Sequence, residues 1–310
     1  DDGGGCVHTL FTPHATRPID DVARDLHPLC ATYLEAGRQA GLAVTADFNG
    51  AAMEGVGLYQ ITTRNGIRMS GARAYLWPAR GRANLRIETG AHATRIAFSG
   101  TKAVGVAFSQ GATLKSARAR REVILAAGAV NSPMLLQASG VGPGELLQAL
   151  GIAVVRDSPA VGRHLQDHLC VDHVYRATVP TLNNQLRPLA GKLWAGLKYL
   201  ALRRGPLSLS VNQGGGFFRS RPGLARPNMQ LYFSPVAYTR ATPGKRELMR
   251  PDREPGFLLS VQPCRPVSRG YVELRSADPF AAPRIVPNGL VEPQDLDDMV
   301  EGVDFLRRLP

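Results

Sequence analysis

The hydrophobic positions near the start of the chain repeat with the period of a helix. Between Asp20 and Gly41, apolar side chains recur at every third or fourth position, at Val22, Leu26, Leu29, Tyr33 and Leu34. This spacing predicts an amphipathic helix, because residues three and four apart share one helix face. Acidic residues stand at its predicted amino end, where they complement the helix dipole, and Gly41 is expected to end it.

The next segment of the chain is interrupted by many glycines. It predicts a strand at 57–63 and a short helix at 71–79. Three short strands are expected next, in NLRIETG, HATRIAFSG and TKAVGVAFSQG. The last two are joined by Ser99 and Gly100, which suit a tight turn. Apolar residues of these two strands would then share one face, so the pattern predicts a β-meander.

The stretch EVILAAG, residues 122–128, departs from this alternation because five consecutive positions before the glycine are apolar. Such a run is typical of a strand that is covered on both faces. Small residues after the strand would let the backbone approach a ligand, and Asn131 or Ser132 would cap a helix with Pro133 at its first position. The arrangement favours a nucleotide-sized ligand, and tight strand–helix packing without a ligand is the alternative.

Later in the chain, proline-rich connections separate further strands. Strands are expected in GGFFRS, NMQLYFSPV, GFLLSVQP and RGYVELRS, which together predict a second lobe with an antiparallel sheet and helices. A basic amphipathic helix, GKLWAGLKYLALRR, is expected at 191–204. Its Leu193, Leu197 and Leu200 are expected to pack onto their own domain, and peripheral contact with a membrane surface is the alternative.

The composition is that of a packed globular protein, with 44% hydrophobic and 20% charged residues among 310. The four cysteines form no CxxC pair, which argues against a disulfide framework or a zinc cluster and favours a reducing cytoplasm. No apolar run approaches the roughly 18 residues of a membrane span, and no signal peptide is recognisable. The net charge of +12 comes with scattered arginines, so we expect a solvated basic surface and no nucleic-acid partner.

The region of the predicted turn and helix contains a longer and more specific pattern. Residues 128–142, GAVNSPMLLQASGVG, resemble the second signature of the glucose–methanol–choline (GMC) oxidoreductases, flavoenzymes that oxidise alcohols. Three further segments agree with this family, and they read RMSGARAYLWPARGRANLRI, SPAVGRHLQDHL and PVSRGYVELRSADPFAAPRIVPN. The resemblance covers essentially the whole chain.

The resemblance implies a bound FAD, with an alcohol carbon that delivers hydride to the flavin and a base that takes the hydroxyl proton. Ala93 falls where family members place a residue whose backbone meets the adenine. Ala126, Ala127 and Gly128 fall where the sheet edge passes the adenosine part of the cofactor. Plain strand packing is the alternative for each residue. The expected partners are a small-molecule alcohol and an electron acceptor that no motif identifies.

The resemblance also implies a fold class that combines α/β and α+β parts. We expect part of a Rossmann-like FAD-binding domain with a β-meander, and a substrate domain with an antiparallel sheet flanked by helices. Residues 1–55 would be a substrate-domain segment, 56–172 an FAD-binding segment and 173–310 a substrate-binding segment.

Two parts of the family pattern are absent from the sequence. The G-x-G-x-x-G dinucleotide fingerprint does not occur, and no segment carries the late active-site histidine. We therefore expect the middle part of a longer enzyme, inactive alone and without a catalytic residue of its own. A flavin-containing lyase of the same fold and a non-catalytic binding fragment are the alternatives. His164 and His168 have metal-ligand spacing for a helix, but Leu165 replaces the glutamate of the zincin motif, so no metal site is expected.

One position bears on the substrate. In choline-specific relatives a glutamate stands eight residues past the histidine of the LQDH segment, where it faces the quaternary ammonium. The equivalent residue, counted from His168, is Arg176. A guanidinium there would repel a trimethylammonium group, which predicts a neutral or an acidic alcohol rather than choline. The alternative is that Arg176 points to solvent.

Overall fold

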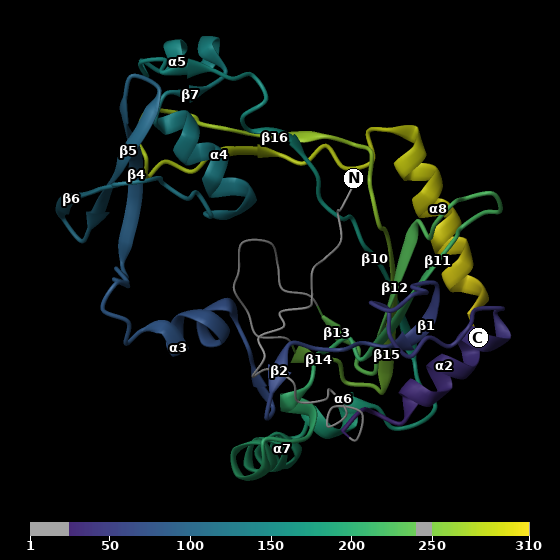
Figure 1. Ribbon diagram of the computed structural model, residues 1–310. Helices are drawn as coiled ribbons and strands as arrows, with labels where there is room; N and C mark the ends of the chain where they lie inside the picture. Colours follow the sequence, from purple (N-terminus) through teal and green to yellow (C-terminus); the bar gives the residue numbers. More distant parts are fainter. Residues whose placement is uncertain (1–24, 240–249, 310) are drawn as a thin grey trace. The chain divides into compact units, whose positions relative to one another are not determined.

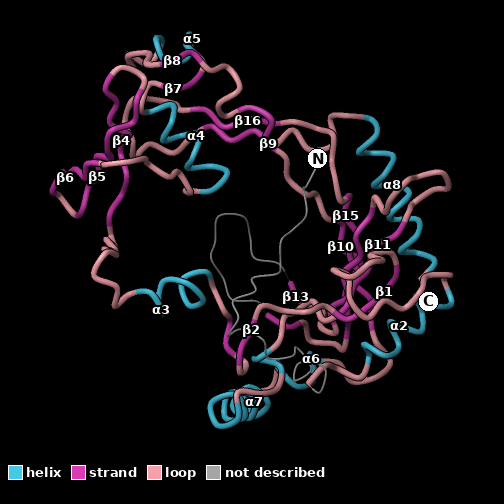
Figure 2. The backbone as a smooth tube through the Cα atoms, in the orientation of Figure 1, coloured by secondary structure: helices cyan, strands magenta, loops and turns pink. Residues whose placement is uncertain are grey.

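The structure of the chain, a computed structural model, describes residues 25–239 and 250–309. Its backbone contacts define two compact units (Figures 1 and 2). Unit 1 comprises Leu169–Arg265 together with the described residues before Arg82 and those after Leu296. Unit 2 comprises Arg82–His168 and Pro266–Leu296.

Unit 1 is built on a five-stranded antiparallel sheet in the order β1, β11, β12, β15, β10. These strands are β1 (Gly55–Leu58), β11 (Gly214–Phe218), β12 (Met229–Ser234), β15 (Gly256–Pro263) and β10 (Val171–Arg176). Buried apolar residues face each other across the central pair, Leu231 opposite Val261 and Phe233 opposite Leu259. The strands predicted in GGFFRS, NMQLYFSPV and GFLLSVQP are therefore confirmed, together with the antiparallel sheet.

Two helices cover the apolar face of this sheet (Figure 1), α2 (Leu29–Gln39) and α8 (Pro293–Arg308). Tyr33 of α2 stacks on Phe233 with ring centroids 4.8 Å apart. Phe305 of α8 stacks on Phe218 with ring centroids 4.1 Å apart. Large aromatic rings remove much apolar area from water, so these contacts fix both helices on the sheet.

Helix α2 confirms the helix predicted from Asp20 to Gly41 only from Leu29 onward, because residues 25–28 are described and are not helical. Its predicted acidic start, Asp20 and Asp21, lies outside the described residues. The predicted end is confirmed, since Gly41 follows the helix with a φ of +89°. The other elements of unit 1 are β2 (Thr63–Arg64), β3 (Ile67–Arg68), η1 (Ala72–Leu76), α3 (Trp77–Ala79), α6 (Leu182–Leu186), α7 (Leu189–Leu202), η2 (Pro206–Ser208), β13 (Tyr238–Thr239) and β14 (Arg250–Pro251).

Helix α7 confirms the predicted basic helix but not its predicted packing. Leu193, Leu197 and Leu200 are exposed, whereas Ala195 is buried. The expectation that these leucines pack onto their own domain is wrong, because α7 rests on α6 and η2 through its opposite, small-residue side. None of the helices in residues 25–239 and 250–309 is long and apolar enough to cross a membrane.

Unit 2 contains the predicted meander, formed by β4 (Ala91–Ser99), β5 (Lys102–Gln110) and β6 (Thr113–Arg118). The predicted turn between β4 and β5 is confirmed, with Ser99 opposite Lys102. The stretch NLRIETG does not form the strand expected of it. In the described chain no strand pairs with this stretch, and the third strand is β6, which pairs with β5.

The rest of unit 2 packs around a small apolar core of Leu147, Ile152 and Leu274. Its elements are α4 (Gly128–Ala138), β7 (Val141–Gly142), α5 (Gly144–Ala149), β8 (Arg156–Asp157), β9 (Arg163–Leu165), β16 (Gly270–Glu273) and β17 (Arg284–Val286). The strand predicted in RGYVELRS is β16, which pairs with β9 and β17 rather than with the unit 1 sheet. The assignment of functions to residues 1–55, 56–172 and 173–310 stays a prediction.

Candidate cofactor site

Helix α4 begins before its predicted cap. Gly128 is its first residue and has a φ of +85°, a value that glycine adopts without steric cost and that turns the chain into the helix. The Ala127 N–H donates to Ser132 Oγ at 3.1 Å, and Pro133 stands inside the helix. The predicted cap at Asn131 or Ser132 is therefore wrong, because the glycine allows the helix to start earlier.

Pro133 removes one backbone donor from the interior of α4. An N–H at this position would donate to the carbonyl of Ala129, four residues earlier, and proline has none. The Ala129 carbonyl does not receive that helical hydrogen bond. The carbonyl oxygen of Ala129, the second residue of α4, is therefore available as an acceptor near the amino end of the helix.

The run before the helix does not form the buried strand predicted for it. Residues 122–126 belong to no helix or strand, and the side chain of Ile124 is 79% exposed. Among the residues that the structure describes, no strand pairs with this run, and Val123 and Leu125 are only partly buried. Ala126, Ala127 and Gly128 are exposed, and a Cβ on Gly128 would meet no atom within 4 Å apart from its chain neighbours. A ligand can thus approach the turn closely.

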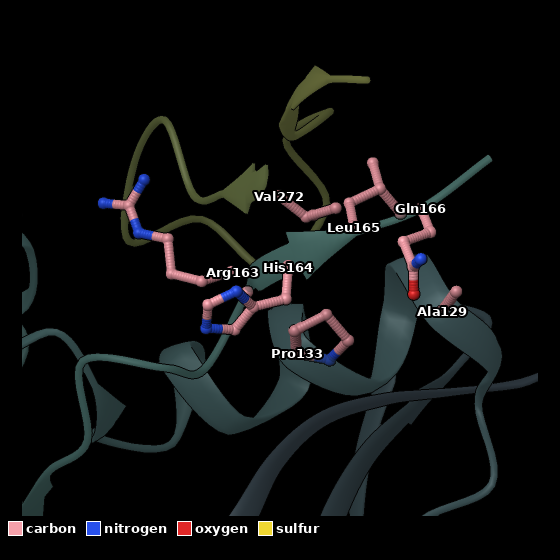
Figure 3. Close-up of a pocket in the computed structure, with 8 residues that line it drawn as sticks. Ala129, Pro133, Arg163, His164, Leu165, Gln166 and Val272 are labelled. Carbon is pink, nitrogen blue, oxygen red and sulfur yellow. The ribbon is translucent and has the colours of Figure 1, made fainter. Parts of the chain in front are cut away.

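A cavity of about 370 Å³ lies beside α4 (Figure 3). Ala129 and Pro133 line it from the helix, and Val272 lines it from β16. The opposite wall is the segment from Gly162 to Gln166, which contains β9. Pockets of this order hold small ligands or parts of larger cofactors.

Gln137 and Gly162 hold this wall to the helix. The buried amide of Gln137 donates to the carbonyls of Val161 (3.3 Å) and Val272 (3.0 Å) and accepts from the Leu274 N–H (3.0 Å). Gly162 has a φ of +85°, and a Cβ there would lie 2.2 Å from the Val272 carbonyl oxygen. Only glycine fits at this position. The cavity wall, α4 and β16 are therefore joined into one hydrogen-bonded assembly.

The cavity rim carries one neutralised cation and one strained histidine. Arg163 pairs with Glu273 at 2.7 Å and lies over the Tyr271 ring. His164 has a left-handed φ of +61°, which costs energy for a residue with a Cβ and persists where its surroundings hold it. In Figure 3 the His164 ring extends from β9 on the side of α4. With the free N–H groups of the first turn of α4, this wall suits a phosphate or another electron-rich group.

His164 and His168 do not form a helical metal pair. Arg163–Leu165 is strand β9, so residues four apart here do not share one helix face. In residues 25–239 and 250–309, no three side chains among His, Cys, Asp and Glu are arranged to hold a metal ion.

The predicted substrate residue, Arg176, lies at the end of β10, an edge strand of the unit 1 sheet. Its Nε is 2.9 Å from a carboxylate oxygen of Glu254, and its side chain is 85% exposed. Asp172 and Val174 share its face of the strand, because alternate residues point to the same side. The positive charge of Arg176 is thus partly balanced by a carboxylate in its own unit.

Comparison with known families identifies the chain. A profile described as GMC oxidoreductase matches residues 15–170, and a second profile with the same description matches residues 266–309. The chain belongs to the GMC oxidoreductase family. All four segments on which the sequence resembled this family lie inside the matched ranges, so the predicted relationship is confirmed.

Individual GMC relatives extend beyond this chain. The alcohol dehydrogenase [acceptor] of Pseudomonas putida is 39% identical over 289 residues, 92% of this chain and 51% of that protein. The mitochondrial choline dehydrogenase of Homo sapiens is 40% identical over 287 residues, 91% of this chain and 47% of that protein. The chain therefore spans about half the length of these curated relatives.

Solved GMC-like structures show the same fold. Formate oxidase from Aspergillus oryzae RIB40 superposes with a TM-score of 0.81 at 25% identity, over 92% of this chain and 54% of that one. Pyridoxine 4-oxidase from Mesorbium loti gives a TM-score of 0.76 at 25% identity, over 92% of this chain and 51% of that one. These similarities confirm the predicted fold class, with its α/β and antiparallel parts.

The predicted cofactor residues of this GMC chain fall at two ends of α4. Ala126, Ala127 and Gly128 lie at its amino end, next to the cavity residue Ala129. Ala93 lies on β4, whose hydrogen bonds to α4 are at the carboxyl end, from the side chain of Arg95 and the N–H of Ile96.

The roles of Gln137 and Gly162 were missed by sequence reasoning. A polar residue among apolar helix positions and a glycine directly before a short strand were the available signals. Neither signal identifies the distant partners, Val272 and Leu274, which lie more than a hundred residues away on β16 or directly after it.

Proposed function

We propose that the protein containing this chain oxidises an alcohol to a carbonyl compound with the help of FAD. When bound, FAD supplies the acceptor for the hydride that leaves the alcohol carbon, while the hydroxyl proton passes to a base. No residue of this chain is proposed as that base. Membership of the GMC oxidoreductase family, over both matched ranges, carries the proposal.

The contribution proposed for unit 2 is to bind and orient the cofactor. The amino end of α4 has free backbone donors and an exposed turn, and the cavity beside it is lined by small and apolar residues of α4 and β16 and by polar residues of the opposite wall. We propose that Ala126, Ala127 and Gly128 contact the adenosine part of FAD and that the Ala93 backbone meets the adenine. The cavity wall at 162–166 would exclude water from the cofactor and hold its position.

The names of the relatives support an alcohol as substrate, because they include an alcohol dehydrogenase and choline dehydrogenases. The same names give less support to the two alternatives, a flavin-containing lyase of the same fold and a non-catalytic binding fragment. We propose a neutral alcohol rather than choline as the substrate, because the positive charge of Arg176 would repel a trimethylammonium group. The Glu254 carboxylate weakens this charge without abolishing it, since both groups are exposed to water.

The function is tested by purifying the full-length protein, releasing its bound flavin and assaying turnover. The proposal expects FAD as the released flavin, and turnover of primary alcohols with an artificial electron acceptor. A protein that contains FAD but turns over none of a broad panel of alcohols would refute the alcohol oxidation and leave only the cofactor assignment standing.

The substrate is tested by comparing choline with 3,3-dimethylbutan-1-ol, its uncharged analogue of equal shape. We expect a higher kcat/KM for the uncharged alcohol, and a several-fold gain for choline in Arg176→Glu, as expected for about 1 kcal/mol between partly exposed charges. Glu254→Gln is the matched control, because it removes the partner of Arg176 and should lower choline turnover further. A wild-type preference for choline would show that Arg176 does not face the substrate.

The cellular setting is also a proposal. A reducing compartment such as the cytoplasm is proposed because the four cysteines lie far apart in the sequence and form no CxxC pair. The physiological electron acceptor is not assigned.

A further inference from the structure

Helix α7 presents its apolar side to solvent. The exposed fractions are 65% for Leu193, 61% for Trp194, 58% for Leu197 and 69% for Leu200. Leu189, one turn earlier, is 72% exposed. These residues recur at every third or fourth position, so they form one continuous stripe along the helix. A stripe of this kind on a soluble unit is normally turned toward a core, and exposed apolar patches of several large side chains mark interaction surfaces.

The packing of α7 explains why the stripe faces outward. Within unit 1 the helix rests on α6 and η2, and its one fully buried residue is Ala195. Asp25 of the same unit forms ion pairs with Lys198, at 3.6 Å, and with Arg204, at 2.9 Å. Figure 1 shows α7 at the edge of its unit, apart from the sheet. The small-residue side and these two ion pairs hold the helix on its unit. The leucines on the opposite side stay exposed.

The charges along the sequence of α7 and its flanks are of one sign, and Asp25, which contacts the helix from outside this segment, pairs with Lys198 and Arg204. From His173 to Thr239 the sequence contains no Asp or Glu, and Arg187 stands just before α7, Lys192 in its first turn and Arg203 directly after it. No carboxylate of the described residues lies within ion-pair distance of Lys192 or Arg203. Apolar side chains bordered by cations, without an acidic residue, are the composition of helices that lie in the headgroup region of anionic membranes. Tryptophan is also enriched at that interface.

The length of α7 decides how it would meet a bilayer. Its 14 residues extend about 21 Å at 1.5 Å per residue, which is short of the about 30 Å of a hydrocarbon core. The helix can lie along the surface but cannot cross it.

We propose that α7 is a membrane-docking helix of this protein. Leu193, Leu197 and Leu200 enter the boundary between headgroups and acyl chains of an anionic lipid bilayer, and Lys192 and Arg203 lie at the lipid phosphates. This surface is distinct from the cofactor site in unit 2 and does not depend on the proposed reaction.

Vesicle co-sedimentation of the full-length protein tests the proposal. Vesicles of phosphatidylcholine with phosphatidylglycerol are compared with vesicles of phosphatidylcholine alone, at low and high salt. We expect binding to the anionic vesicles that weakens with salt. Leu193→Ser combined with Leu197→Ser should lower the partition coefficient at least about tenfold, and Lys192→Gln several-fold.

The β6 strand supplies matched controls. Leu114 is 76% exposed, and Arg118 is exposed on the same strand in the other unit. Leu114→Ser and Arg118→Gln make a comparable apolar-to-polar change and a comparable loss of positive charge away from α7, and they should leave vesicle binding unchanged. Circular dichroism checks that every variant is folded, which we expect because all the changed side chains are exposed.

A fluorescence measurement gives an independent readout on the unsubstituted stripe. The part of the tryptophan emission that Trp194→Phe removes should shift to shorter wavelength when anionic vesicles are added, and hydrogen exchange of α7 should slow only then. Absence of vesicle binding, or equal binding by the double leucine variant, overturns the proposal. So does slow exchange of α7 before vesicles are added, which would mean that another part of the protein covers it. A dimer that the leucine substitutions dissociate, without vesicle binding, would assign the stripe to a second copy.

Discussion

Replacing Gln137 by leucine should destabilise unit 2 far more than the similar size of the two side chains suggests. The Gln137 amide is fully buried and makes three hydrogen bonds, two to carbonyls and one from a backbone N–H. Leucine fills nearly the same volume but offers no donor or acceptor. The carbonyls of Val161 and Val272 and the N–H of Leu274 would lose their partner in a place that water does not reach.

The magnitude follows from the number of groups left without a partner. A buried donor or acceptor without a hydrogen bond costs about 1–3 kcal/mol, and carbonyls with a second partner cost less. We take the lower end for each of the three groups and expect a loss of about 3 kcal/mol in the free energy of unfolding of unit 2. The wall of the cavity should also loosen, because Val161 adjoins the segment from Gly162 to Gln166.

Urea unfolding of the full-length protein measures the loss, and hydrogen exchange of peptides that cover 161–166 and 270–274 locates it. Gln148→Leu is the matched control, because Gln148 is an exposed glutamine at the end of α5. The control should change the unfolding free energy by less than about 0.5 kcal/mol. If Gln137→Leu is as stable as Gln148→Leu and exchange is unchanged, then Gln137 does not hold the cavity wall.

Further predictions concern other parts of the chain. Gly128→Val should lower the FAD content of the purified full-length protein more than Gly128→Ala, since both strain the +85° φ but only valine adds branched carbons beside the cofactor; equal FAD content in both would assign the turn to structure alone. Asp295 accepts from the N–H groups of Val267 and Ser268 at 2.8 and 2.7 Å, and although burial acts to raise its pKa, these hydrogen bonds hold that pKa below its usual value. Its stabilisation is thus fully present above about pH 4 and is lost as the pH falls through the lowered pKa, so Asp295→Ala should cost about 2 kcal/mol at pH 7 in urea unfolding and progressively less as the pH falls below about 4. Burial raises the pKa of the Cys30 thiol to about 12, so mass spectrometry should find Cys30 unmodified by iodoacetamide at pH 8 until the protein is unfolded.

Local signals in the sequence predicted the elements whose ends are set by nearby residues. The end of α2 at Gly41 and the turn between β4 and β5 follow from glycine backbone freedom and from a short-range alternation. Three strands of the unit 1 sheet, β11, β12 and β15, were predictable for a similar reason, since each has apolar residues next to glycine or proline. Strand β10 lacks such neighbours and was not predicted. These features need no knowledge of distant contacts.

The errors occurred where a distant partner or its absence decides the outcome. The run 122–126 has the composition of a buried strand, but strand formation depends on neighbours that the sequence pattern cannot supply. Pro133 was read as a first helical residue, although the glycine at 128 starts the helix earlier. The stripe of α7 was read as a packing face, because periodicity reveals an apolar face but not what covers it.

The candidate site was predictable only in part. The GMC signature located the turn at Gly128, and the structure adds a cavity beside it whose opposite wall comes from another segment. Gln137 and Gly162 act through contacts with β16, more than a hundred residues away, and no local rule connects these positions.

Anaerobic reduction of the full-length protein tests the central claim most directly. The purified protein is mixed with a primary alcohol in the absence of oxygen and of any electron acceptor, and the absorbance of its oxidised flavin is followed. The account predicts that this absorbance disappears and that one carbonyl product forms for each flavin reduced. A protein that binds no FAD, or whose flavin stays oxidised with every alcohol while dithionite reduces it, would contradict the account.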